Sequence, residues 1–164
     1  MKIYLASSWK NKKTVDHVAK ELSNLGHEVD NFTDPFSGKF VFSWTELPQE
    51  ILQDLNANTF LKDWRTQKAF EQDKEKIDRA DAVVMIMPCG RSSHLELGYA
   101  AGKGKKTIIY YPGGFVKGEF ETMYGFANVV TSCIEDIQME LESHVDEKRR
   151  FVDGLVGIRK KNKP

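Results

Sequence analysis

Residues 81–100 read DAVVMIMPCGRSSHLELGYA, and this stretch decides the fold class. Its first part, from Asp81 to Met87, is an apolar run of the length and composition typical of a strand buried on both faces. The loop Pro88-Cys89-Gly90 follows, and a helix is expected from about Leu95 to Lys103. A buried strand that leads into a helix is the repeating unit of open α/β sheets, whose ligands bind at the carboxyl ends of the strands. Glu96 is therefore a candidate functional residue.

The same alternation of strands and helices extends along the chain. Further strands are expected at 2–6, 27–29, 107–111 and 128–130, and further helices at 14–25, 58–79, 119–124 and 134–156. This order predicts an α/β fold with a doubly wound sheet of about five mostly parallel strands and flanking helices. Residues 31–58 differ, with glycine, proline, serine and scattered aromatic residues. Long irregular insertions are usually functional or mobile, so we expect this one to contain short helical pieces and to cover part of the site.

Length and composition indicate one globular domain over residues 1–158, followed by a basic tail at 159–164. The formal net charge is zero, so no global field directs the protein to nucleic acid or to a membrane. Neither a signal-peptide pattern nor an apolar run of membrane-spanning length occurs, and two cysteines make no disulfide framework, so we expect a cytoplasmic protein. The histidines lack metal-ligand spacing and the glycine motifs of Rossmann and P-loop sites are missing, so neither a metal nor a cofactor is expected.

Glu96 has two interpretations from its local sequence. Ser93-x-x-Glu96 matches a capping box, in which the two side chains satisfy free backbone donors at a helix start. A carboxylate near a helix N-terminus, where the helix dipole favours its charged form, also suits a nucleophile. The two roles can coexist, and the pattern alone leaves both open.

Several motifs, taken together in their order and spacing, resemble the nucleoside 2-deoxyribosyltransferase family, including its nucleotide N-glycosidase branch. The motifs are Ile3-Tyr4-Leu5-Ala6, Gln72-Asp73 ahead of Ala80-Asp81-Ala82-Val83-Val84, and Leu95-Glu96-Leu97-Gly98-Tyr99-Ala100 with Gly104-Lys105. The resemblance covers the first strand and about residues 70–124. It implies a flavodoxin-like fold, cleavage of a glycosidic bond between a (deoxy)ribose and a base, and a homodimer or larger homo-oligomer.

The resemblance implies catalytic roles for three residues. Glu96 matches the nucleophile that attacks the anomeric carbon and forms a covalent glycosyl-enzyme, as in retaining glycosidases. Tyr4 matches a tyrosine whose hydroxyl orients that glutamate, and Asp73 matches the acid that helps to protonate the departing base. From the residues alone, Tyr4 reads as an ordinary buried aromatic and Asp73 as one charge on a solvated helix face. Both functional roles therefore depend on the resemblance.

The loop that precedes Glu96 departs from the transferase pattern. Gly90 stands where the transferases carry an acidic base-recognising residue, six positions before the nucleophile. Relatives that act on nucleoside monophosphates tend to place serines around this loop and the first one, and the serines at these positions here are Ser7, Ser8, Ser92 and Ser93. Hydroxyls and free N–H groups at a helix N-terminus form a phosphate site, to which Arg91 adds charge. The alternative is that Ser93 is only a cap and Ser7-Ser8 a polar turn.

Three further positions are candidate ligand contacts. The family often reaches into a neighbouring subunit's site with a polar residue just before the position of Tyr124, where Glu121 and Thr122 both stand and an asparagine is usual. Trp9 is assigned to the pocket, where it can stack on a base, with packing at the sheet edge as the alternative. His94 is interpreted as a surface histidine at a helix start rather than a ligand contact.

These observations predict cleavage or transfer at the N-glycosidic bond of a nucleoside, deoxynucleoside or, preferentially, nucleoside monophosphate, through a covalent glycosyl-glutamate. One alternative is a non-catalytic nucleotide-binding or sensing module of the same fold, in which Glu96 acts purely as a cap. A weaker one is a nicotinamide-dinucleotide glycohydrolase. In each case the partner is a small-molecule nucleoside or nucleotide, and neither nucleic acid nor a membrane is expected.

Overall fold

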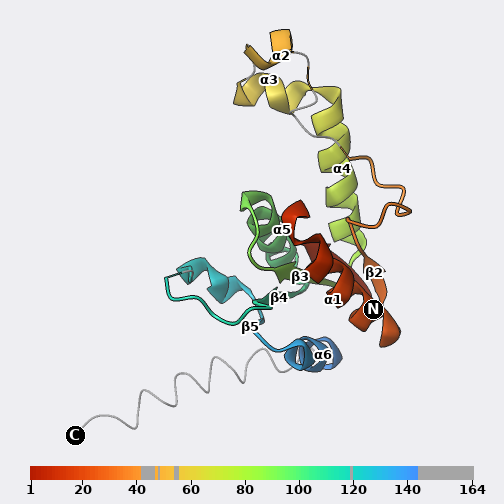
Figure 1. The fold of residues 1–164 in the computed structure, drawn as a ribbon, viewed down its shortest axis with the longest axis vertical. Helices are drawn as coiled ribbons and strands as arrows, with labels where there is room; N and C mark the ends of the chain where they lie inside the picture. The colour runs from red at the N-terminus through yellow and green to blue at the C-terminus, as the bar shows by residue number, and fades with distance from the viewer. Residues whose placement is uncertain (42–46, 48, 54–55, 119, 144–164) are drawn as a thin grey trace, which may run out of the picture.

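The computed structural model describes residues 1–41, 47, 49–53, 56–118 and 120–143. At its centre is a five-stranded parallel sheet with the strand order β2-β1-β3-β4-β5 (Figure 1). The strands are β1 (Lys2–Ala6), β2 (Glu28–Asp30), β3 (Ala82–Ile86), β4 (Lys106–Tyr110) and β5 (Val129–Thr131). The predicted α/β fold is confirmed. The sequence predicts a mostly parallel sheet, and in the structure every described strand pair is parallel.

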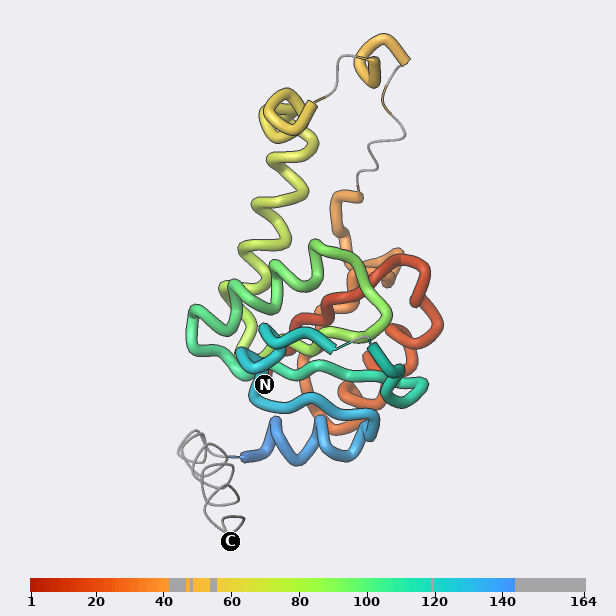
Figure 2. The backbone as a smooth tube through the Cα atoms, turned by 90° about the vertical axis from the view of Figure 1, so that its left-hand side faces the viewer, coloured from red at the N-terminus to blue at the C-terminus, as the bar shows by residue number. Residues whose placement is uncertain are grey.

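Helices cover both faces of the sheet (Figures 1 and 2). One face packs against α1 (Lys12–Asn24) and α6 (Ile134–Glu142), and the other against α4 (Trp64–Arg79) and α5 (Arg91–Gly102). Each face thus has its own hydrophobic core: the first core lies under α1 and α6, and the second core lies under α4 and α5. Successive side chains of a strand point to opposite faces, so Ile3 of β1 belongs to the first core and Tyr4 to the second. This register directs Tyr4 towards α4 and α5.

Lysines on β4 and just before it hold the C-terminal ends of two helices. The last carbonyls of an α-helix lack donors within the helix. The ammonium group of Lys105 donates to the carbonyl oxygens of Asp78 and Ala80 at the end of α4, at 2.8 and 2.5 Å. Lys106 donates in the same way to the carbonyls at the end of α6. Gly104, which precedes them, has a φ of +74° that other residues rarely adopt. The Gly104-Lys105 motif is therefore explained by packing.

The insertion contains short helices, as the sequence predicts: α2 (Gln49–Gln53) and the first residues of α3 (Ala57–Lys62). The helix predicted over 58–79 is instead two helices, α3 and α4, because Asp63 interrupts it and its side chain accepts a hydrogen bond from the N–H of Arg65 at 2.9 Å. In both views α2, α3 and the first part of α4 extend beyond the sheet (Figures 1 and 2).

Several predicted boundaries shift in the structure. The second strand runs one residue later than expected, and α5 begins at Arg91 rather than near Leu95. The short helix before β5 is η3 (Thr122–Phe126), and a further 3-10 helix, η1 (Trp9–Asn11), follows β1. The first part of the helix predicted over 134–156 is α6, which ends at Glu142. The rest of that prediction from residue 144 onwards, and the basic tail 159–164, lie outside the described residues. Within the described ranges, no helix has the length and hydropathy needed to cross a membrane.

Candidate active site

Glu96 lies in the second turn of α5 and is half-buried. The predicted capping box is wrong, because α5 begins at Arg91 and Gly90 is its N-cap residue, with no side-chain cap among the described residues. Ser93 is therefore the third residue of the helix, already beyond the capping position. Since the helix dipole acts mainly within the first turn, it contributes little at Glu96, and the carboxylate is governed by its neighbours instead.

Tyr4 is the first of these neighbours. It is 2% exposed, and its hydroxyl lies close to the Glu96 carboxylate. A nearby donor favours the charged carboxylate, but burial and the nearby Asp73 carboxylate outweigh it and raise the pKa of Glu96 to about 7. Burial and the same carboxylates raise the pKa of Tyr4, so its hydroxyl keeps its proton. Glu96 thus changes charge near neutral pH.

Asp73 reaches the same site from α4. Its side chain is 27% exposed, and its Oδ1 lies 2.5 Å from the Nζ of Lys39. The interpretation of Asp73 as one charge on a solvated face is therefore wrong. Its sequence neighbours do lie on such a face, where Lys74 pairs with Asp78 at 2.7 Å and Glu75 with Arg79. The structure thus brings together all three residues for which the resemblance implies catalytic roles.

Lys39 belongs to the first part of the insertion and was not predicted. Its side chain is 10% exposed, and its Nζ lies 5.4 Å from the centre of the Phe32 ring. The next residue, Phe40, donates its backbone N–H to Oε1 of Gln72 at 2.9 Å. Segment 31–41 therefore contacts α4 beside Asp73, in agreement with the expected position of the insertion. No sequence signal distinguishes Lys39 from the other lysines of the chain.

The loop after β1 is fixed by hydrogen bonds within the protein. Ser7 donates its hydroxyl to the carbonyl of Ile86 at 2.8 Å, and the Ser8 hydroxyl accepts from the N–H of Lys10 at 3.3 Å. Trp9 is 51% exposed and packs edge-on against Phe32, with 5.1 Å between ring centres. The loop thus joins the carboxyl ends of β1 and β3, while the two serine hydroxyls already have protein partners.

The loop before α5 combines exposed and buried candidates. Gly90, Arg91 and Ser92 are exposed, whereas Ser93 is 2% exposed and lies close to the Cys89 thiol. Burial raises the pKa of the Cys89 thiol to about 11, so the thiol stays protonated at neutral pH. Among the four predicted serines, Ser92 is the one that is exposed to solvent.

His94 connects this loop to η3. Its Nδ1 lies 2.9 Å from the carbonyl oxygen of Gly90, and its Nε2 lies 3.1 Å from the Tyr124 hydroxyl. The two rings stack, with 5.8 Å between their centres. His94 is thus a partly exposed histidine in the first turn of α5 that also contacts η3. Glu121 and Thr122, at the start of η3, are both exposed.

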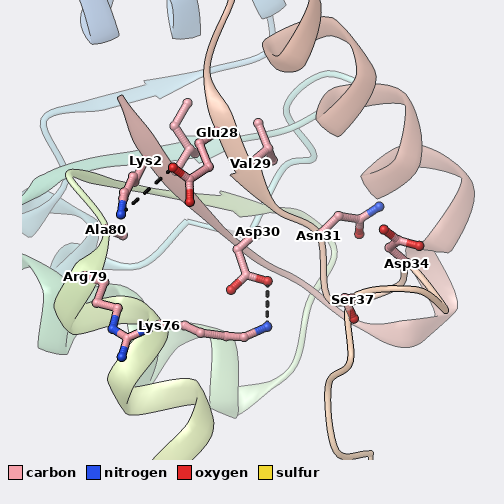
Figure 3. Close-up of a pocket in the computed structure, with 11 residues that line it drawn as sticks. Lys2, Glu28, Val29, Asp30, Asn31, Asp34, Ser37, Lys76, Arg79 and Ala80 are labelled. Atoms are coloured by element: carbon pink, nitrogen blue, oxygen red, sulfur yellow. Dashed lines mark hydrogen bonds and ion pairs between the residues drawn. The ribbon is translucent and has the colours of Figure 1, made fainter.

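A separate cavity of about 370 Å³ lies between β2 and the C-terminal half of α4 (Figure 3). Charged side chains line it, and the ion pairs drawn there are Lys2–Glu28 at 3.9 Å and Lys76–Asp30 at 2.9 Å. Its described lining includes none of the predicted site residues. Within the described part of the chain, no group of three or more His, Cys, Asp or Glu residues is arranged to hold a metal ion.

Solved structures share this architecture. A 2-deoxyribosyltransferase from the psychrotolerant bacterium Bacillus psychrosaccharolyticus matches 84% of this chain and 90% of its own, with a TM-score of 0.56 and 25% identity. The chain has a 2-deoxyribosyltransferase-like fold. The CMP N-glycosidase BcmB of Clostridium botulinum matches 87% of this chain and 98% of its own, with a TM-score of 0.51 and 18% identity. A conserved protein from Enterococcus faecalis V583 matches 92% and 98%, with a TM-score of 0.57 and 13% identity.

The resemblance to this family is thus confirmed at the level of structure, over most of the chain and at low sequence identity. By sequence, neither a protein-family model nor a curated protein matches the chain. Within the 2-deoxyribosyltransferase-like fold, Glu96, Tyr4 and Asp73 lie between β1, α4 and α5. Their catalytic roles remain predictions.

Proposed function

We propose that this protein cleaves or transfers the N-glycosidic bond of a nucleoside, deoxynucleoside or nucleoside monophosphate, with Glu96 as its nucleophile. The observation that carries the proposal is the environment of Glu96: a half-buried carboxylate that lies close to the Tyr4 hydroxyl and to Asp73. Similar folds in a 2-deoxyribosyltransferase and in a CMP N-glycosidase support the choice of bond.

In the first step the ionised Glu96 attacks the anomeric carbon of the sugar. A bond forms between a Glu96 oxygen and this carbon while the carbon–nitrogen bond to the base breaks, and its electron pair leaves with the base nitrogen. The Tyr4 hydroxyl holds the attacking carboxylate in one orientation. A base is a poor leaving group as an anion, so it has to take up a proton as it departs.

We assign delivery of this proton to Asp73, the second carboxyl group of the site. In the substrate complex Asp73 carries this proton, while Glu96 is ionised. In the second step, water attacks the anomeric carbon and releases Glu96, and the proton of the water returns to Asp73. When a second base is the acceptor instead of water, its N–H proton goes to Asp73 in the same way. Both outcomes regenerate the starting protein.

We assign binding of the sugar and its 5′-phosphate to the two loops at the carboxyl ends of β1 and β3. Ser92 and Arg91 are exposed in the first turn of α5, whose N–H groups lack partners within the helix. The hydroxyls of Ser7 and Ser8 already have protein partners and Ser93 is buried, so we propose that they support the loops rather than clamp the phosphate alone. The remaining proposed contacts are Gly90 and Trp9.

We further propose a homodimer or larger homo-oligomer in which Glu121 or Thr122 reaches the site of a neighbouring copy. Exposed apolar side chains on α4, α5 and η3 support an association surface. They are Trp64, Phe70, Leu95, Met123 and Phe126. Sedimentation velocity on the purified protein tests the assembly, and a monomer at all concentrations would contradict it.

One observation favours a nucleotide-sensing module as the second candidate. The Oδ1 of Asp73 is already engaged by Lys39 at 2.5 Å, which is a stable arrangement without any proton transfer. Such a module would bind nucleotides at the same loops and release no base.

The test is release of free base from a panel of nucleosides, deoxynucleosides and their monophosphates, with a nicotinamide dinucleotide included. We expect release by the wild type and a loss of several orders of magnitude in Glu96→Ala. Glu71→Ala is the matched control, because Glu71 is an exposed glutamate on α4, and it should keep full activity. Nucleotide binding without release from any substrate would support the sensing module instead, and nicotinamide release would support the glycohydrolase.

A further inference from the structure

Lys39 is a nearly buried cation that takes part in none of the reaction steps proposed above. Its Nζ lies 2.5 Å from Oδ1 of Asp73, and its side chain is only 10% exposed. Removing an ammonium group from water costs free energy that an exposed surface pair does not require. Such a contact needs a strong local partner, and Asp73 supplies it.

Two more contacts fix the position from which Lys39 reaches Asp73. The ammonium group also lies over the Phe32 ring, 5.4 Å from its centre, and Phe32 is itself 6% exposed. The backbone N–H of Phe40 donates to Gln72, the residue before Asp73, at 2.9 Å. Phe40 follows Lys39 and Gln72 precedes Asp73, so this hydrogen bond lies next to the ion pair in both segments. The two contacts together hold Lys39 against α4.

The charged and titratable groups around Glu96 come from every element that packs against it. Tyr4 faces it from β1, Asp73 from α4, Lys39 from segment 31–41, and Cys89 from the loop before α5. Tyr4 and Cys89 are neutral at neutral pH because burial raises the pKa of both. Among the described residues, Lys39 is therefore the cation that balances two neighbouring carboxylates.

We propose that Lys39 is a positioning residue of this site, which holds Asp73 beside Glu96 and offsets the repulsion between the two carboxylates. Without it, two negative charges would share a half-buried site, and one of them would have to take up a proton or turn away. Lys39 acts on the reaction through Asp73 and Glu96 and needs no contact with the substrate. Its effect on turnover rests on the proposed function, whereas its effect on the two carboxylates does not.

The direction of its electrostatic effect follows from its charge. A nearby cation favours the ionised carboxylate, and Lys39 acts on Glu96 in this sense. Removing it should therefore raise the pH at which Glu96 loses its proton. A residue that only supported the fold would lower activity by the same factor at every pH.

The experiment compares the wild type with Lys39→Met and Lys39→Arg. Methionine retains an apolar stem against Phe32 without the charge, and arginine retains the charge. The first measurement is the titration of Glu96 by carboxyl carbon NMR in the free protein, which needs no substrate. We expect Lys39→Met to move the midpoint of Glu96 up by about one pH unit, and Lys39→Arg to return it to near the wild-type value.

The second measurement is base release as a function of pH. We expect kcat/KM of Lys39→Met to fall about tenfold on the acidic side and to approach the wild-type value at alkaline pH. Lys74→Met is the matched control: it removes an equal charge from the residue next to Asp73, but this lysine pairs with Asp78 at 2.7 Å. It should leave both measurements unchanged.

An unchanged Glu96 midpoint in folded Lys39→Met would overturn the inference, and so would a loss of activity that is equal at every pH. Should Lys39→Met fail to fold, Lys39→Gln takes its place with the same expectations. If no substrate releases base, the proposed function fails while the NMR titration still decides the role of Lys39. If base is released but the titration does not move, the inference fails and the function stands.

Discussion

The Tyr4 hydroxyl lies close to the Glu96 carboxylate, and this contact joins β1, through a residue of the second core, to the second turn of α5. The hydroxyl opposes the effects of burial and of Asp73, which together raise the pKa of Glu96 to about 7. Any change to one of these three influences should therefore appear in the pH dependence of the protein.

The first prediction concerns Tyr4→Phe. In the wild type, kcat/KM should rise with pH through about 7, because only the ionised Glu96 can attack. Phenylalanine removes the hydroxyl that favours the ionised form, so the rise should move to higher pH. Initial rates of base release across the pH range measure it. A rise at unchanged pH in the variant would contradict the proposed contact.

The second prediction concerns stability. The pKa of Glu96 is raised above the ordinary value of 4.5, so the folded state binds the proton more tightly than the unfolded state does. The free energy of unfolding then decreases as the pH rises from about 4.5 to about 7, and the deficit is complete above that range.

Glu96→Gln removes this charge and should raise the free energy of unfolding by roughly 1–3 kcal/mol at a pH of about 8, with little gain near pH 4. Urea denaturation at both pH values measures it. Glu71→Gln, on the exposed face of α4, is the control and should change neither value. A Glu96→Gln protein that is less stable than the wild type at pH 8 would indicate a structural role for Glu96.

The third prediction separates the two roles of Asp73. Asp73→Asn removes a negative charge that raises the pKa of Glu96, so the rise of kcat/KM should move to lower pH. It should also lower kcat by about 10²–10⁴-fold, because the departing base loses its proton donor.

A purine nucleoside methylated on N7 provides the control, since its base leaves as a neutral molecule without taking up a proton. On this substrate Asp73→Asn should keep most of its activity relative to the wild type. Equal losses on the methylated and the ordinary substrate would argue that Asp73 does not deliver the proton.

The sequence predicts the fold well because its signals are local. The continuous apolar run of β3 belongs to a strand whose five residues are all buried, and β1 begins and ends where expected. The start of α5 was placed too late because Gly90 caps the helix without a side-chain hydrogen bond, whereas Ser93 has the residue type of a cap. Asp63 divides the long helix through a capping contact that the apolar pattern does not show.

The site is predictable only in part, because its contacts join distant segments. Glu96 is a candidate from its position after a buried strand, whereas the roles of Tyr4 and Asp73 depend on the family resemblance. The structure brings the three residues together. Lys39 follows no periodic pattern, and its burial depends on how segment 31–41 packs against α4. The contact of His94 with Tyr124 depends in the same way on the position of η3.

The fourth prediction concerns Lys106, which is 9% exposed and donates to the carbonyls of Glu140 and Leu141 at the end of α6, at 2.6 and 3.0 Å. Lys106→Met removes this donor from both carbonyls, of which that of Glu140 still accepts from the Ser143 hydroxyl at 2.8 Å, and should lower the free energy of unfolding by roughly 1–3 kcal/mol. Urea denaturation measures the change. Lys20→Met, on the exposed face of α1, should stay within about 0.5 kcal/mol of the wild type. Equal stabilities for the two variants would mean that this contact does not stabilise α6.

In the proposed reaction Glu96 forms a covalent bond to the sugar. The most direct measurement is peptide mapping by mass spectrometry after incubation with a 2-fluoro-arabinosyl nucleoside, since fluorine at this position slows hydrolysis of the glycosyl-enzyme. We expect a glycosyl adduct on Glu96 in the wild type and none in Glu96→Gln. Base release without an adduct, or an adduct on another residue, would contradict it.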